Sequence, residues 1–109
     1  MPTRFDNKVV TGIGLTPTDV LVAGANERIT IVGFNVTNGG SNDCNFDVFL
    51  TDATPTTGNY LTAISLPSGA TFKVITNGER LVLGPTSKIT VKSSQPNSLH
   101  IVLSFVVIT

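Results

Sequence analysis

The sequence predicts an all-β fold, an antiparallel β-sandwich of the jelly-roll or immunoglobulin-like kind with about eight strands. Val, Ile and Thr together make up 37 of the 109 residues, and such β-branched side chains fit a pleated sheet better than a helix. Turn-forming residues recur at intervals of about ten residues, which is typical of a small sandwich or barrel. No shift in composition marks a second domain, so we expect one domain.

The expected strands lie between these turns. In chain order they cover residues 28–37, 44–51, 60–66, 70–76, 80–83, 88–93 and 98–108. Asn77-Gly78 lies between two of them and predicts a hairpin turn, because both residues tolerate a positive φ. We expect the sandwich domain to span residues 19–109.

Side-chain alternation supports these strands and predicts one irregularity. One face of segment 44–51 is apolar and carries Cys44, Phe46, Val48 and Leu50. In segment 28–37 the alternation changes phase, since Ile29 and Ile31 share one face whereas Val32, Phe34 and Val36 share the other. A β-bulge at Gly33 would explain the change.

The last strand is apolar on both faces. Leu99, Ile101, Leu103, Phe105 and Val107 line one face, and Val102, Val106 and Ile108 line the other. Such a strand is covered on both sides, either within the sandwich or by a neighbouring subunit. The candidate subunit contacts are therefore Phe105 and Val107 on one face, or Val102 and Val106 on the other.

Residues 1–18 predict an extended N-terminal arm. Gly12, Gly14 and Pro17 interrupt any regular element there. The segment is either a frayed terminus or an arm that attaches to a partner by strand addition. Its apolar anchors, and hence candidate partner contacts, are Val9, Val10, Ile13 and Leu15.

Composition excludes several functional classes. Seven Lys and Arg balance seven Asp and Glu, and this neutral chain without a basic run argues against nucleic-acid binding. No apolar segment approaches the roughly 20 residues of a membrane helix. No secretory signal is visible, because no apolar segment follows the charged first residues.

Catalytic and metal-binding signals are weak, so we expect no enzyme, no cofactor and no metal. His100 is the only histidine and lies in the most apolar strand. Cys44 is the only cysteine and begins a strand on its apolar face, where it acts as a small hydrophobic residue. The region 42–52 is rich in Asp and Asn, whose oxygens could bind an ion such as calcium, but it lacks the ligand spacing of an EF-hand. A carbohydrate site is the main alternative, although the chain has no Trp and one Tyr.

Residues 25–109 resemble the small virion structural proteins of tailed bacteriophages, including those that decorate or cement capsids. The motifs that carry this resemblance are NERITIV (26–32), NVTN (35–38), YL (60–61), ISLPSGAT (64–71), GERLVL (78–83), KITV (88–91) and VLSFVVIT (102–109). The resemblance implies a β-sandwich or jelly-roll that assembles on the particle.

The expected function is therefore that of a capsid decoration, or cement, protein that bridges capsid subunits and stabilises the shell. Neck, tail or fibre components and carbohydrate-binding or adhesion modules are the alternatives. We expect the partners to be the major capsid protein or other virion proteins, and copies of the chain itself, with a trimer favoured. The expected location is the virion, after synthesis in the host cytoplasm.

Overall fold

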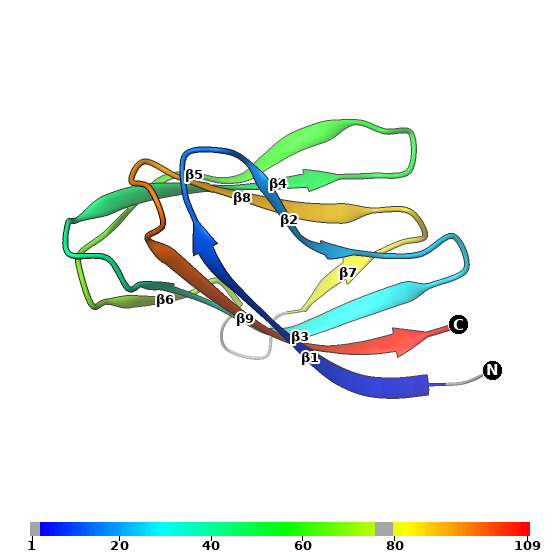
Figure 1. The fold of residues 1–109 in the computed structure, drawn as a ribbon. Coiled ribbons are helices and arrows are strands. Elements are labelled where there is room, and N and C mark those ends of the chain that lie inside the picture. The colour runs from blue at the N-terminus through cyan, green and yellow to red at the C-terminus, as the bar shows by residue number, and fades with distance from the viewer. Residues whose placement is uncertain (1–2, 76–79) are drawn as a thin grey trace.

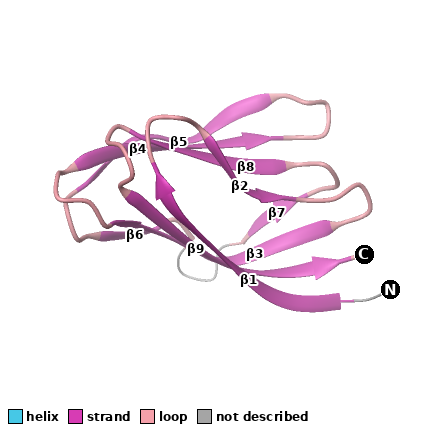
Figure 2. Cartoon of the chain, viewed as in Figure 1, coloured by secondary structure: helices cyan, strands magenta, loops and turns pink. Residues whose placement is uncertain are grey.

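Residues 3–75 and 80–109, described here from a computed structural model, form nine β-strands and no helix. The strands are β1 (Thr3–Ile13), β2 (Thr18–Val22), β3 (Arg28–Asn38), β4 (Cys44–Thr51), β5 (Thr57–Leu66), β6 (Thr71–Lys73), β7 (Leu81–Leu83), β8 (Lys88–Ser93) and β9 (Leu99–Ile108). They build two antiparallel sheets that face each other as the layers of a sandwich (Figures 1 and 2).

The pairing of the strands is nested, as in a long hairpin wrapped into a sandwich. The first strand pairs with the last, β2 with β8, β3 with β6 and β7, and β4 with β5. The five-stranded sheet has the order β1-β9-β3-β6, with β7 also on β3, and the four-stranded sheet has the order β2-β8-β4-β5. Because β6 and β7 act as one interrupted strand, this is the topology of a jelly-roll. The expected all-β sandwich is confirmed, and the topology excludes the immunoglobulin-like alternative.

The core lies between the two sheets and is supplied by alternate residues. From β9 it receives Leu99, Ile101, Leu103, Phe105 and Val107, all nearly inaccessible to solvent. From the opposite sheet β4 contributes Phe46, whose ring meets Phe72 edge-on at a centroid distance of 5.7 Å. Cys44 is buried in this core, as expected. Figure 1 shows how β9 lies between β1 and β3 in its sheet.

A bulge in β3 keeps its apolar residues on the core side. The register between β3 and β9 shifts between Ile31 and Gly33, which confirms the predicted bulge. Ile31 and Phe34 both point inward and are fully buried, whereas Val32 is about half exposed on the outer side. The extra residue therefore restores the alternation that the sequence breaks.

Residues 3–13 are more regular than their glycine suggests. Thr3–Ile13 forms β1, which pairs with β9 from Thr3 to Ile13 with one irregularity after Val10. Gly12, with a φ of 70°, lies at that irregularity. Thr3–Ile13 is therefore an edge strand of the five-stranded sheet.

Other boundaries differ by a few residues. The expected strand 70–76 is shorter, because β6 ends at Lys73. The expected strand 60–66 is longer, because Thr57 already pairs with Thr51. The predicted hairpin turn at Asn77-Gly78 lies outside the described residues.

The side chain of Asn38 links the two sheets by hydrogen bonds at one end of the sandwich. It is fully buried at the end of β3, and its side-chain amide donates hydrogen bonds to the carbonyls of Asn42 at 2.8 Å and Leu66 at 3.0 Å. Its side-chain oxygen accepts a hydrogen bond from the Gly40 backbone at 3.0 Å. Asn38 thereby joins the end of β3 to the loop that follows it and to the end of β5 in the other sheet.

We expect Phe34→Ala to lower the free energy of unfolding by about 3–5 kcal/mol, because it leaves a cavity in a fully packed core. Denaturant unfolding followed by far-UV circular dichroism measures the change. Val22→Ala is the control, since Val22 is 51% exposed and its truncation is expected to change stability by less than about 0.5 kcal/mol. Equal unfolding midpoints for the two variants would contradict this description of the core.

Candidate interaction surface

The outer face of the five-stranded sheet is the candidate functional surface. Residues directly opposite each other in an antiparallel pair share a face, so the register defines its rows. One row joins Phe5, Val106, Thr30 and Val82, which belong to β1, β9, β3 and β7. A second row joins Val9, Val102 and Asn35. We call the surface formed by these rows and Val32 the outer valine face.

The outer valine face exposes several apolar side chains to solvent. Phe5 is 83% exposed, Val9 62%, Val82 59%, Val32 49% and Val102 42%. These are five of the eight exposed large hydrophobic residues found in the described part of the chain. Scattered single apolar residues are normal on a protein surface, whereas several gathered on one face of a sheet make that face a candidate interaction surface.

The face carries little charge. Among the described strand residues that point outward from this sheet there is no Asp or Glu, and the cations Arg28 and Lys73 lie at its periphery. Arg28 is at the start of β3, and Lys73 is on the edge strand β6. The middle of the face is therefore neutral, with the hydroxyl of Ser104 and the bare backbone of Gly33 opposite each other.

The residues expected to contact partners fall into two groups, one on the outer face of the sheet and one in the core. Val9, Val102 and Val106 lie on the outer valine face, as the register shows. The alternative contacts Phe105 and Val107 are only 6% and 1% exposed, so they belong to the core and face no partner.

The expected arm anchors divide in the same way. Ile13 is 1% exposed and Val10 packs partly buried against the core, so both side chains point into the sandwich. Both point inward because their partners in β9 are core residues. Leu15 is 56% exposed, in the loop between β1 and β2.

Three exposed apolar residues of the face, Phe5, Val32 and Val82, were not among the contacts expected from the sequence. Phe5 and Val9 are four residues apart and therefore share a face of an extended strand. The sequence would have grouped them if residues 3–13 had been predicted as a strand. Val32 is turned outward only by the bulge. Val82 alternates with Leu81 and Leu83, and an apolar triplet does not indicate which of its residues faces water.

The core-facing side of β1 is charged in its first half, at the edge of the five-stranded sheet. Arg4, Asp6 and Lys8 are exposed and point to the core side of the sheet, opposite core residues of β9. Arg4 approaches Asp6 at 3.5 Å and Glu27 at 3.8 Å. Inward-pointing charges on an edge strand oppose the addition of another strand, because the added strand would have to cover them.

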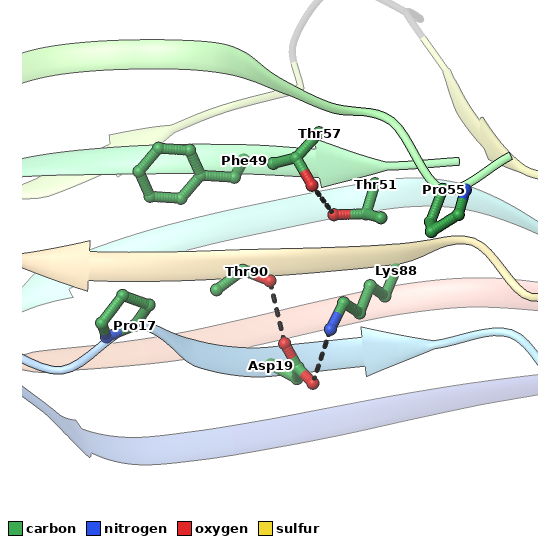
Figure 3. A pocket seen from close by; sticks show the side chains of 8 residues that line it. All are labelled: Pro17, Asp19, Phe49, Thr51, Pro55, Thr57, Lys88 and Thr90. Carbon is green, nitrogen blue, oxygen red and sulfur yellow. Dashed lines mark hydrogen bonds and ion pairs between the residues drawn. The ribbon is translucent and has the colours of Figure 1, made fainter. Parts of the chain in front are cut away.

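The four-stranded sheet carries a shallow, open groove of about 590 Å³ on its outer face (Figure 3). We call it the Phe49 groove; its lining residues are Pro17, Asp19, Phe49, Thr51, Pro55, Thr57, Lys88 and Thr90. The Asp19 carboxylate accepts a hydrogen bond from the Thr90 hydroxyl at 2.9 Å and pairs with the Lys88 ammonium at 3.4 Å. Polar groups of the groove are therefore already bonded to one another, so the groove is ordered without a ligand.

The acidic residues of region 42–52 organise backbone rather than converge on one point. Asp43 accepts a hydrogen bond from the Ser68 backbone at 3.0 Å. Asp47 accepts one from the Ala63 backbone at 2.6 Å, at an irregularity in β5. Asp52 accepts hydrogen bonds within the loop that follows β4. Within residues 3–75 and 80–109, no three His, Cys, Asp or Glu side chains form a cluster that could hold a metal ion.

The two candidate reactive residues are on different sheets. His100 is exposed on the outer side of β9, and Cys44 is buried between the sheets at the start of β4. Their side chains therefore do not form a joint site. None of the described segments is a helix of the length and apolarity that crossing a membrane would require.

Comparison with solved structures shows a shared fold. A chain from the crystal structure of the T13 particle of infectious bursal disease virus superposes with a TM-score of 0.52 at 11% sequence identity, over 96% of this chain and 30% of that chain. A chain from the structure of the Gt strain of this virus gives a TM-score of 0.46 at 10% identity, over 96% and 32% of the two chains. The present chain thus spans about a third of the length of those viral chains. No protein-family model matches the sequence, and no curated protein matches it.

The hydrogen bonds of the loop after β4 predict an acid-sensitive contribution to stability. The Thr54 hydroxyl and the backbone amides of Thr56 and Thr54 all donate to the Asp52 carboxylate and hold its pKa below the ordinary value of 3.8. A lowered pKa in the folded state stabilises the fold above the unfolded value, and this contribution disappears as the pH falls through the folded value.

We therefore expect the Asp52 carboxyl to titrate below pH 3.8 in a carbon-detected NMR titration. In Asp52→Asn, the loss of stability between about pH 4 and pH 2 should be smaller than in the wild-type protein. A carboxyl that titrates at or above its ordinary value would contradict the hydrogen-bonding pattern of this loop.

Proposed function

We propose that this protein is a structural component of a virion, and specifically a capsid decoration protein that has no enzymatic activity. The observation that carries the proposal is the outer valine face. It is an apolar sheet surface with a neutral middle, on a jelly-roll whose described buried side-chain polar atoms all have hydrogen-bond partners. The fold shared with the viral particle chain supports the proposal, since jelly-rolls are a common architecture of capsid subunits, but the same fold hosts other functions. The outer valine face, rather than the fold, is therefore the main support for a virion role.

The proposed mechanism is mechanical. Each copy buries apolar surface against other virion subunits, and the removal of this surface from water favours association. A symmetric shell repeats the same contact many times, so a modest contact per copy adds up to substantial resistance of the shell to internal pressure. The major capsid protein is the proposed partner, and the exposed Leu15 is the proposed attachment element beyond the face.

We expect purified virions to contain this protein in many copies, in a fixed ratio to the major capsid protein. Quantitative mass spectrometry of purified particles measures that ratio. Particles stripped of the protein should release their genome at a lower temperature than intact particles, and re-addition of the purified protein should restore the difference.

A few copies per particle would instead indicate a neck, tail or fibre component. Absence of the protein from purified particles would reject the virion role altogether. The thermal measurement uses stripped particles incubated with bovine serum albumin as the control for non-specific protection.

Carbohydrate binding is a second candidate function, and the Phe49 groove is the observation that favours it. The groove places the partly buried Phe49 beside a carboxylate, an ammonium and several threonine hydroxyls. An apolar surface with a few oriented polar groups is the usual composition of a small-molecule site. The apolar face of a sugar ring could pack on Phe49, and the sugar hydroxyls could form hydrogen bonds with the polar groups of the groove.

If the groove binds a glycan, a panel of mono- and disaccharides should contain at least one member that raises the melting temperature. A ligand at 100 times its dissociation constant adds about 2.7 kcal/mol to the stability of the folded state. Phe49→Ala should abolish this rise, whereas Val82→Ala, on the opposite sheet, should retain it. A panel that leaves the melting temperature of the wild-type protein unchanged would remove this candidate.

A further inference from the structure

We propose that Asn38-Gly39 is a site of spontaneous deamidation that reacts only when its end of the sandwich opens, and whose product prevents that end from closing again. We call these two residues the Asn-Gly pair. The reaction requires water and no enzyme. Its chemical class is an intramolecular acyl transfer from the side-chain amide to the backbone nitrogen of the next residue.

The chemistry follows from the sequence of the pair. The Gly39 backbone nitrogen loses its proton and bonds to Cγ of Asn38, and the side-chain nitrogen takes up a proton and leaves as ammonia. The resulting succinimide ring is opened by water. Attack of water at Cγ gives aspartate, and attack at the main-chain carbonyl carbon gives isoaspartate. Glycine favours ring closure, because no Cβ obstructs its nitrogen and its backbone rotates freely in an open chain.

The folded structure holds both reacting groups apart. The Gly39 backbone nitrogen donates a hydrogen bond to the Ser98 carbonyl at 2.8 Å, so its N–H points at that carbonyl. The side-chain nitrogen of Asn38, which would be the leaving group, is held by the carbonyls of Asn42 and Leu66. Asn38 is also 0% exposed, so the water that the reaction needs does not reach it.

The backbone of Asn38 is fixed as well. Its nitrogen donates to the Ala70 carbonyl at 3.0 Å, and its carbonyl accepts from the Gly69 nitrogen at 2.8 Å. Ring closure requires the side chain and the following nitrogen to rotate toward each other, and these hydrogen bonds oppose that rotation. The Asn-Gly pair therefore reacts only after several of its hydrogen bonds have broken together.

The bonds that must break lie at one end of the molecule. They join the Asn-Gly pair to the loop after β3, to the end of β5 and the loop that follows it, and to Ser98 just before β9. Figure 1 shows these segments at the same end of the sandwich. Loops and strand ends open more readily than core strands, so this end opens without unfolding of the whole domain.

Neither product fits the closed structure. In aspartate, a carboxylate oxygen takes the place of the amide nitrogen and faces the carbonyl oxygens of Asn42 and Leu66, where no donor remains. A buried charge without a partner is costly. In isoaspartate the main chain is one atom longer, so Gly39 no longer meets Ser98 while β3 keeps its register. The link between the two sheets is lost in both cases.

The first test is the rate of deamidation of the wild-type chain at mildly alkaline pH over a series of urea concentrations. Mass spectrometry of tryptic peptides measures it, because peptide 29–73 contains Asn38 and peptide 74–80 contains the second Asn-Gly sequence, at Asn77. Fragmentation locates the reacted residue in the longer peptide. We expect Asn38 to react at least about 100-fold more slowly without urea than in the unfolded chain. Similar rates in the two states would overturn the inference.

The second test asks whether the opening is local. The Ser98 hydroxyl bonds to Ser93 at 2.7 Å and to the Gln95 carbonyl at 3.0 Å, at the end that holds the Asn-Gly pair. Thr51 bonds to Thr57 at 2.8 Å, at the other end of β4, so Thr51→Ala is the matched control for Ser98→Ala.

The two variants are compared at urea concentrations that give them the same global stability. Ser98→Ala should then deamidate at Asn38 about fivefold faster, which is the effect of one lost hydrogen bond on local opening. Equal rates would show that the pair reacts through global unfolding and would overturn the local opening.

The third test concerns the product. Wild-type protein and Gly39→Ala are incubated in urea until Asn38 of the wild type has reacted, then refolded and melted. Gly39→Ala retains every asparagine but closes the ring slowly, so it controls for deamidation elsewhere in the chain. Its Cβ would meet the His100 ring at 2.6 Å, and this ring is exposed and free to turn aside.

We expect incubation to lower the melting temperature of the wild-type protein by at least about 5 °C more than that of Gly39→Ala. Asn38→Asp reproduces one product without incubation and should also melt lower than the wild type, which keeps the test valid if Gly39→Ala fails to fold. An incubated wild-type protein that melts as before, or an Asn38→Asp variant as stable as the wild type, would overturn the claim that the product keeps this end open.

Discussion

The whole architecture depends on β9 being paired on both sides. Its backbone bonds to β1 along one edge and to β3 along the other, and its alternate residues fill the middle of the core. A buried backbone group without a hydrogen-bond partner is costly, so an apolar strand in this position requires two neighbours. Once the last strand pairs with the first, the remaining pairs follow in nested order. The same pairing directs Val102 and Val106 outward and assembles the outer valine face from residues far apart in sequence.

The sequence predicts much of this fold, because its strands are locally recognisable. The expected strands 44–51 and 88–93 coincide with β4 and β8 at both ends. The bulge near Gly33 was predictable because a strand that changes phase can keep its apolar residues in the core only by inserting an extra residue. The two-faced character of the last strand was also visible, although alternation alone could not say which face is inside.

The candidate surface was less predictable, because it arises from pairing between distant segments. Glycines and a proline make residues 1–18 look irregular, and only the hydrogen bonds to β9 hold Thr3–Ile13 as a strand. Phe5 and Phe34 are the same residue type, yet one is 83% exposed and the other fully buried. Their difference comes from what lies above each side of the sheet, which no local pattern records. Likewise, the Asp-rich region suggested an ion site, whereas each carboxylate bonds to a different stretch of backbone.

The bulge in β3 has a consequence for which changes this protein can accept. Strand side chains alternate with a period of two, so a shift of one residue exchanges the two faces of a strand. Deletion of Val32 is an exception, because it only closes the bulge. Ile31 and Gly33 would then be consecutive, as their partners Phe105 and Ser104 already are, so Ile31 would stay in the core. Replacement of Val32 by another residue alters only the outer surface. Variants that replace Val32 and variants that lack it are therefore both expected to keep Arg28 and Thr30 on the outer face of the sheet.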